Sequence, residues 1–110
     1  MFNFIDLRDG KAVLVWELPG DGGPFPLAKY KAYSVQVSGE FAGGRVDLMG
    51  SNETDADSNF ALLNDPNGNP LAFFSPKIEQ IMEDVVKIVP KLVGPPEMKV
   101  KVSIFISMVR

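Results

Sequence analysis

The 110-residue chain contains neither cysteine nor histidine. Without cysteine it forms no disulfide and offers no thiolate as a nucleophile or metal ligand. Without histidine it lacks the usual general base near neutral pH and the commonest ligand of transition metals. We therefore expect a protein that is not an enzyme and that uses no cofactor.

A surplus of basic residues and long apolar runs are also missing. The net charge is −3, with 14 acidic and 11 basic residues, whereas nucleic-acid binding depends on neutralising phosphates with lysine and arginine. No apolar run approaches the roughly 18 residues that a membrane span requires. The segment Met1–Arg8 shows no basic-then-apolar pattern, so we expect no secretory signal there. These features predict that neither nucleic acid nor a membrane is a partner.

Turn-forming residues are abundant instead. Nine prolines and ten glycines divide the chain into short pieces, while 45% of its residues are hydrophobic. Short strands separated by many turns are typical of all-β folds. We predict an all-β fold, namely a two-sheet sandwich or jelly-roll-like barrel of about seven or eight short strands with one short helix. Residues 1–10 are predicted to form an N-terminal segment, and residues 11–110 a single β-sandwich domain.

Alternation of apolar and polar residues indicates the strands, because successive side chains of a strand point to opposite faces. The predicted strands are Lys11–Leu18, Tyr33–Phe41, Arg45–Gly50, Phe60–Leu63, Leu71–Phe74 and Lys99–Val109. The turn sequence Ala-Gly-Gly at 42–44 joins two of them, so we predict a β-hairpin there.

One segment favours a helix. Ser75 followed by Pro76 fits a helix N-cap and first helical position, and apolar residues recur at helical spacing after them. We predict a short helix within residues 75–84. The β-branched run 85–89 then favours a strand, in which Pro90 indicates an edge or a bulge. A helix that continues through this run is the alternative.

One loop has part of the pattern of a metal site, but the residues that follow it do not complete the pattern. Asp55, Asp57 and Asn59 have the spacing that opens a calcium-binding loop. However, Phe60 stands in place of the expected glycine, and Pro66 in place of the bidentate glutamate. We therefore expect a solvated polar loop and no metal.

The N-terminal segment is the candidate site for binding a partner. Phe2, Phe4, Ile5 and Leu7 place apolar surface before the first turn, at Asp9-Gly10. The segment could form a strand in the domain's own sheet, or it could act as an arm that pairs with another subunit. Both interpretations stay open at this stage.

The stretch Tyr33–Val93 carries a resemblance to a known group of proteins. Its motifs are a hairpin, a turn, a brief helix and a strand, at Ser34–Phe41 with Gly43–Asn52, Phe60–Leu71, Ile78–Ile81 and Pro90–Gly94. In these motifs the chain resembles small β-sandwich proteins encoded among the virion genes of tailed bacteriophages.

This resemblance implies a virion structural protein without catalytic residues. Within that class we expect a capsid cement, or decoration, protein that stabilises the head by binding the major capsid protein. Its other expected partners are copies of itself. Its expected location is the capsid surface, after synthesis in the host cytoplasm. A tail or head–tail component is the alternative within the same class.

A carbohydrate- or receptor-binding module is the alternative from a different class, since β-sandwiches support many such functions. A sugar site would expose Trp16, Tyr30 or Tyr33 beside carboxylates or amides. An assembly protein would instead expose apolar surface or an unpaired strand edge near the chain ends.

Overall fold

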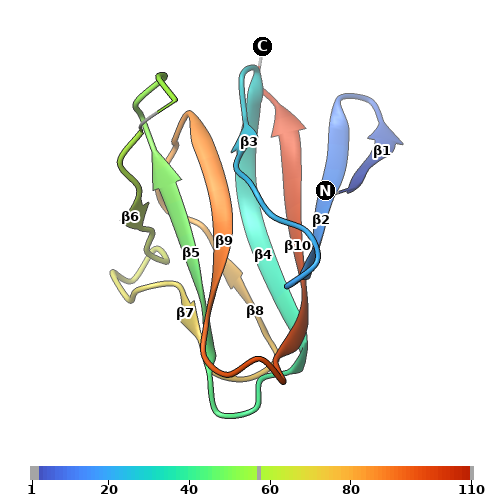
Figure 1. The fold of residues 1–110 in the computed structure, drawn as a ribbon. Coiled ribbons are helices and arrows are strands. Elements are labelled where there is room, and N and C mark those ends of the chain that lie inside the picture. The colour runs from blue at the N-terminus through green and yellow to red at the C-terminus, as the bar shows by residue number, and fades with distance from the viewer. Residues whose placement is uncertain (1–2, 57, 110) are drawn as a thin grey trace.

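The computed structural model describes residues 3–56 and 58–109, and its ten strands form two facing sheets (Figure 1). The strands are β1 (Asn3–Arg8), β2 (Lys11–Leu18), β3 (Phe25–Pro26), β4 (Tyr30–Glu40), β5 (Arg45–Ser51), β6 (Ala61–Leu62), β7 (Ala72–Phe73), β8 (Lys77–Gln80), β9 (Lys87–Val93) and β10 (Lys99–Met108). The all-β prediction is confirmed, with more strands than expected. Within the described ranges, no helix is long and apolar enough to cross a membrane.

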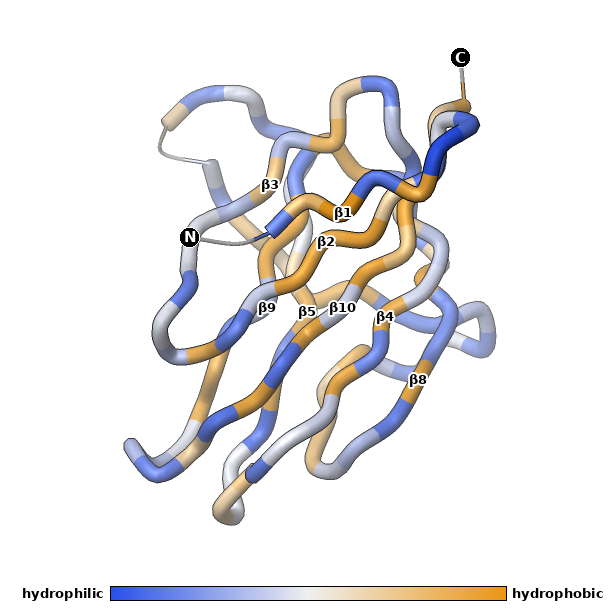
Figure 2. Tube along the Cα trace, turned by 90° about the vertical axis from the view of Figure 1, so that its right-hand side faces the viewer, coloured by the Kyte–Doolittle hydropathy of each residue, from blue (hydrophilic) through white to orange (hydrophobic). Residues whose placement is uncertain are grey.

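Every strand pairing in the two sheets is antiparallel. The first, sheet A, has the order β1-β2-β10-β4-β8, which Figure 2 shows across the face turned to the viewer. The second, sheet B, has the order β3-β9-β5-β6, and β7 also pairs with β5. Strands from both ends of the chain therefore meet in sheet A, where β10 lies between β2 and β4.

The core lies between the two sheets and follows the alternation of the sequence. Its largest fully buried side chains include Leu14, Trp16, Leu48, Ile88, Ile104 and Ile106. Burying an aliphatic side chain of this size contributes about 1.5–3 kcal/mol relative to leaving it in water. Trp16 is buried completely, and its indole N–H donates to the carbonyl of Gly23 (3.2 Å). The only tryptophan is therefore part of the core.

The predicted hairpin across residues 42–44 is wrong. Strand β4 pairs with β10 and β8 in sheet A, whereas β5 pairs with β9 in sheet B. The chain crosses between the sheets at a turn in which the Gly44 N–H donates to the Phe41 carbonyl (2.8 Å). Alternation identifies a strand and its inner face, but it does not identify the neighbouring strand, because both sheets present the same kind of apolar inner face.

The predicted helix within residues 75–84 is also wrong, because Lys77–Gln80 forms strand β8 on the edge of sheet A. The apolar residues at helical spacing do not share a face: Ile81 is buried, whereas Ile78 and Met82 are 61% and 58% exposed. A helix this short is marginal by itself. As a strand, the segment instead pairs with the open edge of β4 from Ser34 to Val37.

Pro90 lies inside strand β9, opposite Leu48 of β5. Leu48 donates its N–H to Leu71 (2.9 Å), and its carbonyl accepts from Leu63 (3.0 Å). Both backbone groups of Leu48 thus point away from β9. Pro90 and Leu48 are therefore a pair of opposite residues that form no hydrogen bonds with each other. A missing N–H costs nothing at such a position.

Candidate interaction surface

Strand β1 forms one edge of sheet A. It pairs with β2 from Asn3, opposite Val15, to Arg8, opposite Lys11. The connecting turn has positive φ at Asp9 (55°) and Gly10 (77°), as a type I′ hairpin turn requires. No described strand pairs with the outer side of β1, and all six of its residues are exposed.

The candidate N-terminal residues lie on this edge, except that Phe2 is outside the described residues. Phe4, Ile5 and Leu7 are 43%, 47% and 49% exposed. The ring of Phe4 contacts the rings of Phe25 (6.2 Å between centroids) and Tyr30 (5.8 Å), partly closing the side of the sandwich. Ile5 lies opposite Val13, whose side chain points out from sheet A. The edge therefore carries apolar side chains on both faces.

Further exposed apolar residues, which the sequence interpretation did not single out, lie at the adjoining end of the sandwich. Met108, opposite Tyr30 on β4, donates its N–H to the Gly10 carbonyl (2.7 Å). A hollow of about 410 Å³ beside it is lined by Tyr30, Val86 and Val109, among others. Since Tyr30 contacts both Phe4 and this hollow, the apolar surface is continuous with β1.

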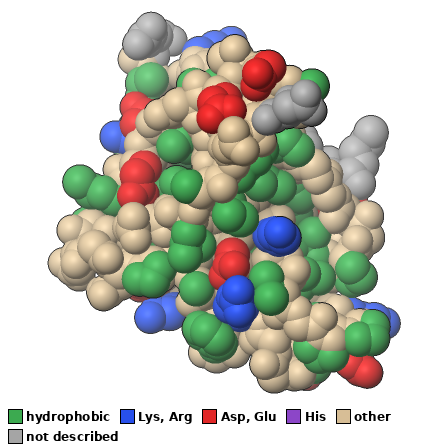
Figure 3. Space-filling model, turned by 60° about the vertical axis from the view of Figure 1, so that its left-hand side comes forward, with side chains coloured by type: hydrophobic (Ala, Val, Ile, Leu, Met, Phe, Trp, Pro, Cys, Tyr) green, Lys and Arg blue, Asp and Glu red, His purple; other side chains and the backbone are tan. Residues whose placement is uncertain are grey.

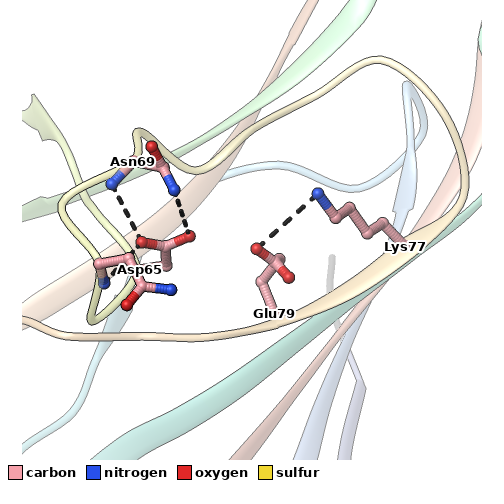
Figure 4. Close-up of polar contacts among 5 residues, drawn as sticks. Asp65, Asn69, Lys77 and Glu79 are labelled. Carbon is pink, nitrogen blue, oxygen red and sulfur yellow. Dashed lines mark hydrogen bonds and ion pairs between the residues drawn. The ribbon is translucent and has the colours of Figure 1, made fainter.

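The opposite edge of sheet A, strand β8, is mostly polar, and Ile78 is its exposed apolar residue. Lys77 and Glu79 approach each other at 3.9 Å (Figure 4). They also line a hollow of about 140 Å³ together with Asp65 and Asn69, which belong to the turn beside the strand. A charged strand that is flanked by a turn is a poor template for pairing with another chain.

That turn is organised by the carboxylate of Asp65. It accepts hydrogen bonds from the backbone N–H groups of Asn67 (2.9 Å) and Asn69 (3.0 Å) and from the Asn69 side chain (3.5 Å; Figure 4). The hydrogen bond from the Asn69 backbone is the main reason why the pKa of Asp65 is lowered. The carboxylate is thus fully engaged in holding the turn.

Glu83 holds Asn64, the residue before Asp65, in a similar way. Its carboxylate accepts from the backbone N–H and the side-chain amide of Asn64, both at 2.8 Å. Burial, the largest influence on Glu83, raises its pKa, but the hydrogen bonds from Asn64 outweigh burial and the net effect lowers the pKa. Both carboxylates are therefore stabilised in their charged form.

The loop considered for calcium receives the positively charged side chain of Lys87. The Lys87 ammonium donates to the Asp55 carbonyl (2.8 Å) and to the Ser58 hydroxyl (2.7 Å). Asn59 donates to the carboxylate of Glu53. Asp57 lies outside the described residues. Among the described residues, including this loop, no three acidic side chains lie together as metal ligands do.

The outer face of sheet B mixes charged and apolar residues. Arg45 and Asp47 form an ion pair of 3.0 Å on β5, and Lys91 lies opposite Asp47 on β9. Figure 3, which brings the side with β5 and β6 forward, shows acidic and basic side chains among hydrophobic ones. Such mixing is ordinary for a solvated surface.

Comparison of the chain with models of known families, with curated proteins and with solved structures finds no match. The candidate site is therefore defined by its geometry alone. It is a strand edge with exposed apolar side chains that no described strand pairs with, and it adjoins a hollow lined by apolar residues together with Lys29 and Asp84.

Proposed function

We propose that the protein is a non-enzymatic assembly protein that binds a partner protein through the free edge of β1. The observation that carries the proposal is the state of this edge: six exposed residues with Phe4, Ile5 and Leu7 among them, and no described strand on the side of β1 that faces away from β2. An extended segment of a partner can add to such an edge through main-chain hydrogen bonds.

The hollow beside β1 supplies the second part of the binding surface. Affinity in strand addition comes from the main chain, and selectivity comes from pockets that receive side chains. The apolar part of the lining, from Tyr30, Val86 and Val109, suits an aliphatic or aromatic side chain of the incoming segment, and Lys29 and Asp84 lie beside it. We therefore place the partner's contact over β1 and the adjoining end of the sandwich.

Within this class we propose a capsid cement protein that binds the major capsid protein on the surface of a tailed-phage head and associates with copies of itself there. The support for this narrower role is the resemblance of residues 33–93 to small virion proteins. Many identical sites on a lattice convert modest contacts into strong overall attachment.

The experiment is co-sedimentation of the purified chain with phage heads that lack it. We expect saturable binding and an increase in the temperature at which the heads release DNA. The double variant Ile5→Lys/Leu7→Lys should lose binding, because two charges then line the edge. Ile78→Lys, at an exposed isoleucine of β8 (61%, against 47% and 49% for Ile5 and Leu7), is the control and should bind like wild type.

Two results would contradict the proposal. The first is wild-type protein that remains in the supernatant at every head concentration. The second is equal loss of binding by the β1 and β8 variants, since the contact would then not depend on β1.

A further inference from the structure

A second surface lies on the outer face of sheet A, and it extends from Val13 of β2 to the edge strand β8. One hollow of about 140 Å³ is lined by Val13, Ser34, Gln36, Ile78, Ser103 and Phe105. A larger one, of about 460 Å³, is lined by Ser34, Asp65, Pro66, Asn67, Ile78, Glu79 and Gln80. The two hollows share Ser34 and Ile78, so they form one shallow groove across β10, β4 and β8.

The strand register explains why these side chains converge. Ser103 of β10 lies opposite Gln36 of β4, and Gln36 lies opposite Ile78 of β8. In the next row, Phe105 lies opposite Ser34, and Ser34 opposite Gln80. Short serine side chains at the centre, between larger neighbours, leave the surface hollow.

The polar groups of the groove are uncommitted. The side chains of Ser34, Gln36, Gln80 and Ser103 make no hydrogen bond to any described residue. Each hydroxyl and amide can both donate and accept hydrogen bonds. They lie beside the apolar side chains of Phe105, Val13 and Ile78, which line the same hollow. Few convergent polar groups around apolar surface are characteristic of ligand sites.

The charge of the lining limits the kind of ligand. No lysine or arginine lines either hollow, and the acidic residues Asp65 and Glu79 lie at one end. Glu79 is paired with Lys77 (3.9 Å) and the Asp65 carboxylate is held by its own turn, so the lining offers no unpaired charge to an ionic ligand. A neutral sugar fits better, because its ring has apolar C–H faces that can lie on Phe105 and hydroxyls that can reach the serines and glutamines.

We infer that this groove is a binding site for a neutral oligosaccharide. The site does not rest on the proposed assembly function, because its residues differ from those of the free edge. It combines neutral hydrogen-bonding groups, an aromatic ring beside Tyr33 (6.1 Å between centroids) and a lining without basic residues.

The test is a titration of ¹⁵N-labelled protein with cellohexaose, maltohexaose and chitohexaose, followed by NMR. We expect saturable shifts from at least one of the three sugars at the amides of Gln36, Gln80, Ser103 and Phe105. Gln36→Ala and Gln80→Ala should each weaken binding about three- to tenfold, the effect of losing one or two hydrogen bonds.

Ser38→Ala is the matched control, because Ser38 lies two residues along β4 from Gln36 and lines neither hollow. It should bind like wild type. The inference is overturned by the absence of saturable shifts with all three sugars, or by glutamine variants that bind as tightly as the control. It is also overturned if an extended serine- and glutamine-rich peptide shifts these amides while the sugars do not.

The two sites can be separated in one set of proteins. Ile5→Lys/Leu7→Lys should lose head binding and keep sugar binding. Gln36→Ala should keep head binding and weaken sugar binding. Failure of either function therefore leaves the other measurable.

Discussion

Strands β1 and β8 are the two edges of the same five-stranded sheet, but they differ in length and in the side chains that they expose to solvent. β1 has six residues and exposes Phe4, Ile5 and Leu7. β8 has four residues, carries the Lys77–Glu79 ion pair and lies beside the turn organised by Asp65. Natural sheets commonly protect their edges with short strands, charges and covering loops. β8 has all three of these features.

Sheet B protects its edges as well. β3 and β6 have two residues each, and β3 contains Pro26, which has no N–H to offer a neighbour. In β1 only the C-terminal end is protected. There the Arg8 N–H donates to the Asp6 carboxylate (2.8 Å), and the pairing register with β2 shifts. The part from Asn3 to Asp6 stays open. Among the described edge strands, β1 is therefore the long one that stays open to pairing with another chain, and it exposes the most apolar side chains.

The largest effect is expected at Ile104, on the strand that connects the two halves of sheet A. Its side chain is fully buried. Ile104→Ala should lower the free energy of unfolding by about 2–5 kcal/mol, the range for such truncations. Lys101→Ala, an exposed site on the same strand, should change it by less than about 0.5 kcal/mol. Equal effects in denaturant titrations would mean that the register of β10 is wrong.

An intermediate effect on stability is expected when the pH is lowered, through Asp65 and Glu83. The pKa values of Asp65 and Glu83 are lowered in the folded protein, so their stabilising contribution is complete above the ordinary carboxyl range. It is lost as the pH falls below about 4 and through the lowered values. The melting temperature should therefore fall in acid.

The variant Asp65→Asn/Glu83→Gln checks this assignment. It should melt earlier than wild type at neutral pH and show a flatter decline between about pH 4 and pH 2. Melting curves that decline in parallel for both proteins would assign the acid sensitivity to other carboxylates.

The smallest effect on stability is expected on β1. Ile5→Lys/Leu7→Lys changes only half-exposed side chains, so each substitution should alter the free energy of unfolding by about 0.5 kcal/mol or less. Chemical denaturation measures this directly. A loss comparable to that of Ile104→Ala would show that β1 is part of the stabilising core, and the contrast between the two edges would disappear.

The sequence predicted strands better than it predicted neighbours. Alternation in Lys99–Val109 predicted both the strand and its buried face, because Val100, Val102, Ile104 and Ile106 all enter the core. The same signal in residues 33–50 led to a hairpin that does not exist, since pairing is decided by long-range contacts. Helical spacing in residues 75–84 was overridden by the open edge of β4.

The candidate site was only partly visible in the sequence. The apolar N-terminal residues stood out because they precede a turn that is typical of hairpins. The hollow with Tyr30 and Val109 brings together residues far apart along the chain, so no local pattern could indicate it. The groove on sheet A depends on the register of three strands, which the sequence alone did not fix.

The most direct test of the central claim is hydrogen–deuterium exchange of the chain, free and bound to phage heads. Amides on an unpaired edge exchange quickly, and pairing with a partner strand protects them. We expect new protection in residues 3–6 of β1 and unchanged exchange in β8. Unchanged exchange in β1, with protection appearing at β8 or on the outer face of sheet B, would contradict the account.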